Sequence, residues 1–441
     1  MKEQFDVVVI GSGVSGIQVA FSLSKKMRCA IVEKRDFGGT CVLRGCDPKK
    51  VLVGGMEAVH LSKRLRGHGI KQKASISWPD LMAFKKSFVE DVPASLEKSF
   101  IEAGIETFKG EAKFIDEHTI EVDGQRLTAN YFVIATGASP VILDIKGKEH
   151  LKTSDDFLSL ESLPQNITFI GGGYIAFELA AIASAAGSEV HVILHNSKPL
   201  KAFDPDHVAL LVSELQEMGV IFHFDTDVQE VLKQETHYLL TGNDFNLKTE
   251  LVFSAIGRHP NTKALQLEKA KVDYDNHGIN VNQYLEATKN IYACGDVANT
   301  KGLPLTPVDS FEANAVVEQI LSGRKEVRYP VIPSVVFSSP KLAQIGISAE
   351  EAMKDLEKYH VNEIDMTNWY TYRRTNEALS AAKIITEKTT GKVCGVSLIS
   401  EEAEEMINYF VLIINAHLTL DELKQYIFAY PGAANDLTSL L

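Results

Sequence analysis

The chain has 441 residues, which is enough for about three domains of ordinary size. Its hydrophobic content of 45% is typical of a globular protein, and no stretch approaches the roughly 18 apolar residues of a membrane helix. The 45 basic and 58 acidic residues give a net charge of -13, which argues against nucleic acid as a partner. Since the N-terminus lacks a secretory pattern, we expect a cytoplasmic protein with neither a membrane nor a nucleic-acid partner.

The first elements form the pattern of a dinucleotide-binding unit. A strand expected at 5–10 runs into a glycine turn, a helix follows at 17–25, and a second strand at 29–33 ends in Glu33. The glycines Gly11, Gly13 and Gly16 let the backbone approach a pyrophosphate at the helix N-terminus. Glu33 would then accept hydrogen bonds from ribose hydroxyls. A strand-to-helix turn without a ligand is the alternative interpretation.

Two cysteines, Cys41 and Cys46, follow this unit and are separated by four residues. Pro48 suits the first turn of a helix, so we expect Cys46 at a helix N-terminus. Backbone N–H groups and the helix dipole lower a thiol pKa at that position, so the pair is a candidate redox centre. Two unrelated buried cysteines are the alternative, and we expect core positions for the other three, Cys29, Cys294 and Cys394.

Further along, a second copy of the dinucleotide pattern begins. A strand at 167–170 enters a turn with Gly171, Gly173 and Ala176, a helix continues to about 186, and a strand covers 189–194. His195, followed by Lys198 and Lys201, stands where a ribose-binding acid is expected. Cations attract a 2′-phosphate that an acid would repel, so the pattern favours NADPH over NADH. Ordinary solvated lysines are the alternative, because no arginine is present to bind phosphate through two hydrogen bonds.

The remaining segments complete an α/β protein. Strands are expected at 108–126 and 131–134, and again at 252–256 and 291–293, where each ends in a glycine turn. From about residue 332, strands at 332–337 and 393–399 and a helix at 402–416 indicate an α+β domain without a nucleotide motif. The thirteen histidines show no HExxH spacing, so we expect no catalytic metal.

In their order and spacing, these motifs resemble the pyridine nucleotide-disulfide oxidoreductases, the family of glutathione reductase, dihydrolipoamide dehydrogenase and mercuric reductase. The resemblance spans nearly the whole chain. Besides the first glycine turn, it is carried by Gly38 to Lys50, Ala135-Thr136-Gly137, Gly171 to Glu178, Gly257-Arg258-x-Pro260-Asn261, Ala293-Cys294-Gly295-Asp296, Leu305-Thr306-Pro307, and Ile332 to Phe337.

The resemblance implies a homodimer whose subunits have two Rossmann-like domains and a C-terminal α+β dimerisation domain. The FAD-binding domain would comprise 1–147 and 265–328, the NAD(P)H-binding domain 148–264, and the dimerisation domain 329–441. Hydride would pass from NADPH to FAD, and two electrons would then reach the Cys41–Cys46 disulfide. The reduced pair would act on a disulfide or another small acceptor.

The resemblance also implies roles for single residues. Cys46 would lie next to the flavin, Cys41 would meet the substrate, and Lys50 or its neighbour Lys49 would pair with Glu178 beside the flavin. Tyr174 would cover the nicotinamide pocket. The remaining FAD-binding residues would be Gly39, Thr40, Ala135, Thr136, Gly137, Gly295 and Asp296, and Gly257 would join the NAD(P)-binding set.

The C-terminal segment departs from the family pattern. Thiol-reducing members carry a His-Pro-Thr segment with a downstream glutamate, whereas this chain has Tyr430 in place of the histidine and Asn435 in place of the glutamate. A phenol does not take up a proton at neutral pH as an imidazole does. Mercuric reductases resemble the chain in that tyrosine but add a C-terminal cysteine pair, and no cysteine follows Cys394. Two alternatives therefore stay open: a flavin-dependent reductase or oxidase of a quinone, metal ion or oxygen, and an FAD-binding redox sensor without substantial turnover.

Overall fold

The structure is a computed structural model that describes residues 2–440, so the outer ends of the expected domains, residues 1 and 441, lie outside it. The chain divides into two compact units. The first unit comprises residues 1–49, 83–141 and 258–329, and the second comprises 50–82, 142–257 and 330–441. The second unit therefore holds most of the segments expected for the NAD(P)H-binding and the dimerisation domain, together with residues 50–82, whereas 258–264 and 329 belong to the first unit.

The first unit is built on an eight-stranded sheet with the order β18-β19-β6-β1-β2-β3, to which β5 adds at β6 and β4 at β5. β1, β2, β3, β6 and β19 run parallel to one another. The strands are β1 (Lys2–Ile10), β2 (Cys29–Glu33), β3 (Glu106–Lys109), β4 (Ala112–Asp116), β5 (Thr119–Val122), β6 (Gln125–Ile134), β18 (Glu286–Thr288) and β19 (Ile291–Ala293).

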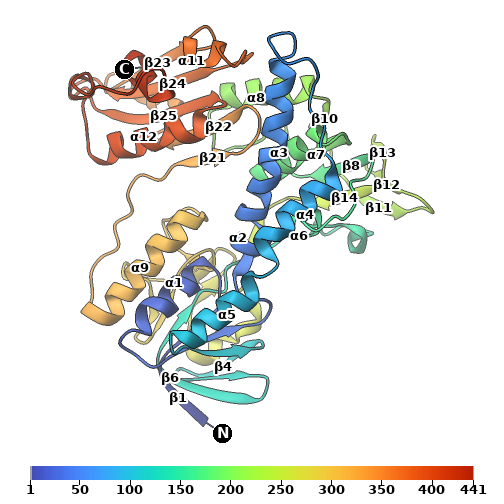
Figure 1. Cartoon of the computed structure of the whole chain (residues 1–441). Coiled ribbons are helices and arrows are strands. Elements are labelled where there is room, and N and C mark those ends of the chain that lie inside the picture. Colours follow the sequence, from blue (N-terminus) through green and yellow to red (C-terminus); the bar gives the residue numbers. More distant parts are fainter. Residues whose placement is uncertain (1, 441) are drawn as a thin grey trace. The chain divides into compact units, whose positions relative to one another are not determined.

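Apolar side chains on both faces explain why β1 occupies the middle of this sheet. Val8 and Ile10 belong to the core on one face, and Val7 and Val9 belong to the core on the other. A strand covered on both faces reads as a continuous apolar run, as this one does. Helices α1 (Val14–Leu23) and α9 (Thr306–Ser322) lie side by side on the second of these faces (Figure 1).

Several shorter elements complete the first unit. β7 (Ala138–Pro140) pairs with β15 (Arg258–Pro260), and β16 (Tyr274–Asp275), β17 (Gly278–Asn280) and β20 (Ala298–Asn299) form a small sheet. The helices α2 (Gly39–Arg44) and α5 (Val92–Glu102) belong to it as well. Helices α3 (Cys46–Arg64) and α4 (Trp78–Val89) contribute residues to both units.

The second unit contains a four-stranded parallel sheet with the order β10-β9-β8-β14. Its strands are β8 (Asn166–Ile170), β9 (Glu189–Ile193), β10 (Val220–His223) and β14 (Leu251–Ser254), and its helices are α6 (Ser154–Phe157), α7 (Tyr174–Ala185) and α8 (Pro205–Glu217). An antiparallel sheet follows, made of β11 (Glu230–Lys233), β12 (Tyr238–Thr241) and β13 (Asn246–Thr249).

The C-terminal part of the second unit is an antiparallel five-stranded sheet with the order β21-β22-β25-β24-β23 and helix α12 (Ala403–Asn415) packed against β22 and β25. Its strands are β21 (Ser334–Val336), β22 (Lys341–Gly346), β23 (Tyr359–Asp365), β24 (Ala381–Glu387) and β25 (Val393–Ser400). Short helices complete it: α10 (Ala349–Ala352), α11 (Tyr370–Arg373), α13 (Leu420–Leu423) and α14 (Leu437–Leu440).

The predicted fold class, two dinucleotide-binding sheets followed by an α+β domain, is confirmed. The strands predicted at 29–33 and 291–293 have those limits, and the helix predicted at 402–416 is α12. The helix predicted to begin at Cys46 is α3, whereas α2, α4 and α5 were not predicted. Among residues 2–440, no helix is long and apolar enough to cross a membrane.

Candidate active site

The two predicted glycine turns have the same backbone geometry. A Cβ atom added to Gly11 would lie 2.3 Å from the carbonyl oxygen of Ala135, and one added to Gly171 would lie 2.2 Å from that of Ala255. Only glycine therefore allows the turn to pass this close to the neighbouring strand. By contrast, Gly13 and Gly173, which precede α1 and α7, have open space beside them.

These open positions lie where a bound phosphate would meet the first N–H groups of the helices. The third position packs tightly in both units, since Ala176 is fully buried and a Cβ on Gly16 would lie 1.9 Å from the carbonyl oxygen of Gly11. The backbone of both turns thus fits a dinucleotide. Gly39 reaches the first turn as well, because a Cβ there would lie 2.4 Å from the Cα of Gly13.

Glu33 is held in place at the end of β2. Its Oε2 accepts hydrogen bonds from the Ser12 N–H at 2.9 Å and from the Ser12 hydroxyl at 2.8 Å, and its Oε1 accepts one from the Arg35 N–H at 2.8 Å. An ionised carboxylate has about four acceptor positions, so this geometry leaves one for a ligand hydroxyl. Glu33 is suited to the ribose contact that the sequence predicts.

Residues of separate motifs meet beside Thr136 and Gly137. The Thr136 hydroxyl donates to the Asn261 carbonyl at 2.9 Å, and the Asn261 side-chain amide donates back to the Thr136 carbonyl at 2.8 Å. Asn261 N–H also donates to the Gly137 carbonyl at 2.9 Å. The resemblance named the Thr136-Gly137 and Asn261 segments as separate motifs, and the structure shows that hydrogen bonds join them.

The Gly295-Asp296 turn at the end of β19 carries a cluster of acids. Glu312 of α9 accepts the Gly295 N–H at 2.8 Å, and burial raises the pKa of Glu312 and of Asp296, while Arg258 lowers that of Asp296. Asp309 lies one turn before Glu312. Burial, with Asp296, Glu312 and Cys46 adding to it, raises the pKa of Asp309 to about 8.

Cys41 and Cys46 are both free thiols and lie together at the junction of two helices. Cys41 belongs to α2, and Cys46 is the first residue of α3, as predicted. The Thr306 hydroxyl, at the start of α9, is 3.3 Å from the Cys46 sulfur and 3.3 Å from the Cys41 sulfur. Three segments of the first unit therefore converge on two sulfur atoms.

The two thiols have opposite acidities. The hydrogen bond from Cys41 lowers the pKa of Cys46 to about 6 against the effect of burial, and Thr306 and Lys49 lower it further. The same hydrogen bond and burial raise the pKa of Cys41 well above its usual range. Cys46 thus holds the negative charge at neutral pH. The sequence predicted this acidity from the helix N-terminus, whereas the largest cause is the neighbouring thiol.

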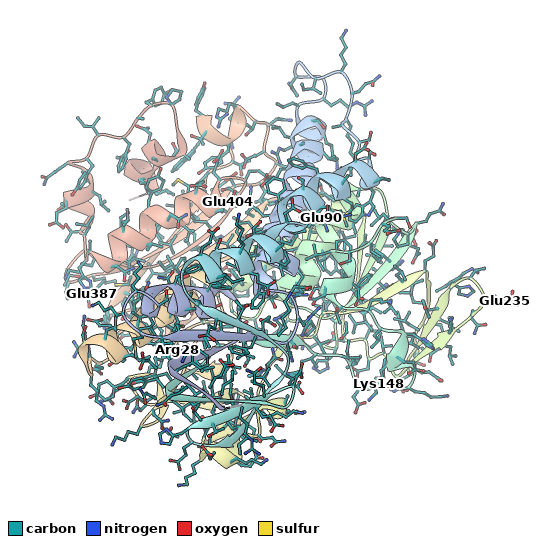
Figure 2. The ribbon with its side chains drawn as sticks, turned by 60° about the horizontal axis from the view of Figure 1, so that its bottom comes forward. Arg28, Glu90, Lys148, Glu235, Glu387 and Glu404 are labelled. Atoms are coloured by element: carbon teal, nitrogen blue, oxygen red, sulfur yellow. The ribbon has the colours of Figure 1, made fainter. Side chains whose placement is uncertain are left out.

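One form of the prediction paired Lys50 with Glu178, but Lys50 pairs with Glu404 instead. Its ammonium lies 2.5 Å from Glu404 of α12, a residue labelled in Figure 2, and 4.3 Å from the centre of the Phe337 ring. Glu178 is only 3% exposed and accepts the Phe337 N–H at 2.8 Å. Lys49, the other lysine that the resemblance allowed, lies in the first unit and lowers the pKa of Cys46.

Glu404 belongs to an ion cluster that fixes α3 within the second unit. Lys341, whose side chain is 5% exposed, lies 2.9 Å from Glu57 of α3 and 3.6 Å from Glu404. Arg64, near the end of α3, pairs with Glu401. The buried ammonium of Lys341 is tolerated because these carboxylates surround it. Lys50 shares Glu404 with Lys341, so Lys50 is part of the same structural network.

The predicted phosphate-binding residues of the second turn lie at the surface. His195 follows β9, and its side chain is 77% exposed, with Nδ1 3.6 Å from the carboxylate of Asp227. Lys201 is exposed as well. Asp227 was missed from the sequence because it follows β10, about 30 residues after His195. Its negative charge opposes the attraction of a 2′-phosphate.

Tyr174 and Tyr430 are exposed aromatic residues. Tyr174 begins α7 directly after Gly173 and is 44% exposed, which suits a side chain covering a bound ligand. Tyr430 is 73% exposed, and its ring centre lies 6.3 Å from that of Tyr370. Thr40 and Ala135 belong to the first unit and are the sequence neighbours of Cys41 and Thr136. Gly257 has open space beside it.

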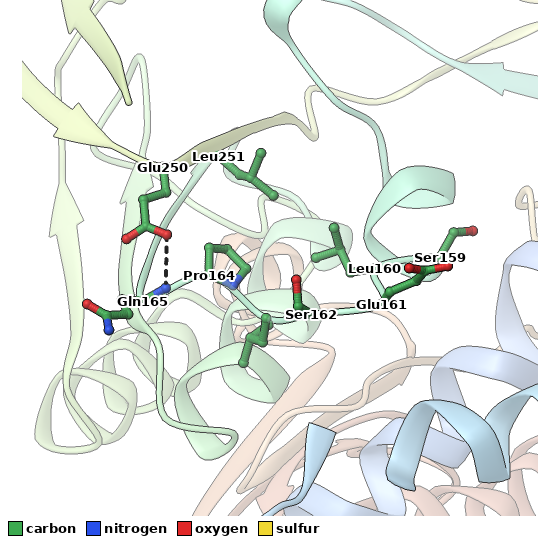
Figure 3. A pocket seen from close by; sticks show the side chains of 9 residues that line it. Ser159, Leu160, Glu161, Ser162, Pro164, Gln165, Glu250 and Leu251 are labelled. Atoms are coloured by element: carbon green, nitrogen blue, oxygen red, sulfur yellow. Dashed lines mark hydrogen bonds between the residues drawn. The ribbon is translucent and has the colours of Figure 1, made fainter. Parts of the chain in front are cut away.

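A shallow depression in the second unit lies apart from these residues. It is lined by 159–165, Glu250 and Leu251, and Glu250 accepts the Gln165 N–H at 3.3 Å (Figure 3). None of the predicted site residues lines it.

Two dinucleotide-binding turns and an acidic cysteine beside a second thiol define a flavin-linked, pyridine-nucleotide-dependent redox enzyme. Comparison with known families gives the narrower assignment. Residues 5–314 match the family described as pyridine nucleotide-disulphide oxidoreductase, and residues 332–440 match its dimerisation domain. The chain belongs to this family, and the resemblance seen in the sequence is confirmed.

Relatives within the family include reductases of two kinds. The chain is 32% identical to a glutathione reductase of Burkholderia cepacia over 100% of this chain and 99% of the relative. It is 31% identical to the chloroplastic and mitochondrial glutathione reductase of Pisum sativum, over 99% of this chain and 82% of that one. It is 30% identical to a mercuric reductase of Lysinibacillus sphaericus, again over 99% and 82%.

Among solved structures, the fold is similar to that of RclA from Escherichia coli, described as an HOCl-induced flavoprotein disulfide reductase. The TM-score is 0.90 at 26% identity, covering 98% of both chains. A copper(II) complex of RclA gives a TM-score of 0.90 at 25% identity, covering 99% of both.

Proposed function

We propose that this protein uses NADPH to reduce a Cys41–Cys46 disulfide and that the reduced pair delivers two electrons to a small acceptor. The observation that carries the proposal is the thiol pair itself, with Cys46 made acidic by Cys41, Thr306 and Lys49. FAD, when bound, supplies the hydride acceptor and the two-electron carrier. Glu33, Gly13, Gly295 and Asp296 are the residues we assign to holding it.

The two cysteines have different roles in this proposal. Cys46 holds the thiolate, which is the species that interacts with an oxidised flavin. Cys41 holds the proton and forms the mixed disulfide with an acceptor once that proton has moved. Tyr174 and Gly173 belong to the nucleotide side, where His195 and Lys201 favour NADPH, and NADH stays possible because Asp227 faces His195.

The acceptor is proposed to be a disulfide. Glutathione reductases among the relatives and the description of RclA as a disulfide reductase support this choice. A metal ion is the second candidate, because mercuric reductases and the copper(II) complex of RclA are similar to this chain. The match to the dimerisation domain supports a homodimer. The cytoplasmic location stays a prediction.

Anaerobic titration of the FAD-loaded protein with NADPH tests the assignment. Two-electron reduction should produce a long-wavelength absorbance band from the Cys46 thiolate beside oxidised flavin. Cys46→Ser should abolish the band, whereas Cys41→Ser should keep it and should still lose disulfide turnover. Cys29→Ser, at a fully buried cysteine of β2, is the control. A band that survives in Cys46→Ser contradicts the assigned roles.

The same cysteine variants distinguish reduction of a disulfide from the second candidate, reduction of a metal ion. If turnover on a metal ion or quinone persists in Cys41→Ser and Cys46→Ser, the cysteines are not the exit for electrons. If neither disulfides, metal ions nor quinones increase NADPH oxidation in the wild type, the enzymatic proposal itself fails.

A further inference from the structure

The Thr306 hydroxyl contacts both sulfurs of the cysteine pair. Its oxygen lies 3.3 Å from the Cys46 sulfur and 3.3 Å from the Cys41 sulfur, within hydrogen-bond range for sulfur. Thr306 is the first residue of α9, a 17-residue helix that packs against α1. The hydroxyl is therefore attached to a rigid element.

A hydroxyl has one proton to donate, so Thr306 can stabilise only one thiolate at a time. Both sulfurs lie at the same distance, and the proton changes partner by rotation about the Cβ–Oγ bond without movement of any heavy atom. We propose that Thr306 is a positioning residue of the reduced cysteine pair, donating its proton to whichever sulfur carries the negative charge. The inference rests on the proposed function, since it concerns the same cysteine pair.

The benefit of this arrangement is a change of nucleophile within the pair. In the resting reduced form, Cys46 holds the charge and Cys41 holds the proton. When Cys41 attacks an acceptor, the S–H bond of Cys41 breaks, an S–H bond forms on Cys46, and the negative charge moves to Cys41. Thr306 then turns from Cys46 to Cys41. The Cys41 thiolate forms an S–S bond with one sulfur of the acceptor disulfide, the S–S bond of the acceptor breaks, and the departing thiolate takes the proton from Cys46. The pair thus exchanges its proton internally before the attack, so this transfer needs no imidazole.

The electrostatic surroundings agree with this role. Thr306 lowers the pKa of both thiols, as a donor to either thiolate must. Lys49 favours the charge on Cys46, whereas Asp47 opposes a charge on either sulfur. Asp309, three residues after Thr306, also interacts with Cys46. The Thr306 oxygen lies 3.3 Å from both sulfurs, so its hydroxyl is placed to serve either one.

The pH dependence of alkylation measures this effect without relying on turnover. The FAD-loaded protein is reduced anaerobically with dithiothreitol and treated briefly with iodoacetamide between pH 5 and 9. Peptide mass analysis then gives the labelled fraction of Cys41 and of Cys46 separately. In the wild type, Cys46 should become reactive with a midpoint near pH 6. Thr306→Val should raise this midpoint by about one pH unit, because a hydrogen bond to a charged group is lost.

Thr306→Ser and Thr306→Ala form the matched pair, since they differ only in the hydroxyl. Serine should keep the wild-type midpoint, and alanine should behave as valine does. Thr128→Val controls for the substitution itself, because the Thr128 hydroxyl donates to the Glu3 carbonyl at 2.9 Å in β6. Equal midpoints of Cys46 alkylation in Thr306→Ser and Thr306→Ala would overturn the inference. This comparison holds even if Thr306→Val fails to fold.

The two proposals fail in different ways. If NADPH does not reduce the cysteine pair in the wild type, the proposed function is wrong, while reduction by dithiothreitol still tests Thr306. If NADPH reduces the pair normally and the hydroxyl has no effect on the midpoint, only the role of Thr306 is wrong.

Discussion

The two dinucleotide-binding turns have nearly identical backbones, but their ribose-binding positions differ. A Cβ on Gly11 or Gly171 would lie 2.3 or 2.2 Å from a carbonyl oxygen of the neighbouring strand. At the end of the next strand, however, Glu33 is fixed by three hydrogen bonds, whereas His195 is exposed and faces the acid Asp227. The close approach of the backbone is thus common to both turns, whereas the side chain at the ribose position is held by hydrogen bonds in the first turn and is exposed in the second.

The same contrast extends to the rest of the predicted site. Cys41, Cys46 and Glu33 in the first unit have fixed polar partners, while His195 and Tyr430 in the second unit are mostly exposed. Removing a fixed charged partner costs more than removing an exposed one. We therefore expect substitutions in the first unit to have the larger effects.

Glu33→Ala should give the largest effect. It removes the acceptor predicted for ribose and leaves the Ser12 N–H without its partner, so the affinity of the flavin-free protein for FAD should fall about 100-fold. Quenching of flavin fluorescence during titration measures this dissociation constant. Glu189→Ala, at the start of β9 in the second unit, is the control and should leave FAD affinity unchanged. An unchanged affinity in Glu33→Ala would remove the main difference between the two turns.

Asp309→Asn should stabilise the flavin-free protein at alkaline pH. The folded-state pKa of Asp309 is raised from its usual 3.8 to about 8, so between those values the folded protein binds a proton that the unfolded chain has lost. The free energy of unfolding of the wild type must fall as pH rises through this window. Asparagine has no proton to lose. The free energy of unfolding of Asp309→Asn, relative to that of the wild type, should therefore be on the order of 2 kcal/mol larger at pH 8 than at pH 6.

Urea unfolding at the two pH values measures this difference. Asp80→Asn, at an exposed position of α4, should show no such change. A constant difference between wild type and Asp309→Asn would mean that this carboxyl is not protonated in the folded protein.

The sequence predicted those features of the fold and of the site that depend on residues close together in the chain. Glycines that only a tight turn accommodates, and strands buried on both faces, identified both dinucleotide units, and Pro48 placed Cys46 at a helix start. Contacts between segments that are distant in the chain could not be predicted from such local patterns. Asp309 and Thr306 come within reach of Cys46 only because α9 packs beside α1, some 260 residues after the cysteines. Lys50 pairs with Glu404 of α12, some 350 residues later in the chain, and no local pattern near Lys50 indicates this contact.

Asp227→Asn should shift the nucleotide preference by a smaller amount. Removing an exposed negative charge 3.6 Å from His195 favours a 2′-phosphate, so the ratio of kcat/KM for NADPH to that for NADH should rise about threefold. Because the charge is solvent-exposed, the effect should weaken at high salt. Steady-state kinetics with both nucleotides measures the ratio, and Glu235→Gln in the β11–β12 loop is the control. A falling ratio would mean that His195 and Lys201 do not contact the 2′ position.

Tyr430→Phe should give the smallest effect, a change in turnover of less than twofold between pH 6 and 9. The Tyr430 side chain is 73% exposed, its ring lies near Tyr370, and no hydrogen bond of its hydroxyl is found within residues 2–440. Phenylalanine keeps the ring and removes only the hydroxyl. Disulfide-dependent NADPH oxidation across this pH range measures the effect, with Tyr370→Phe as the matched control. A tenfold loss confined to Tyr430→Phe would assign this hydroxyl the proton transfer that we ascribe to Cys41, Cys46 and Thr306, and the second unit would then supply part of the redox chemistry.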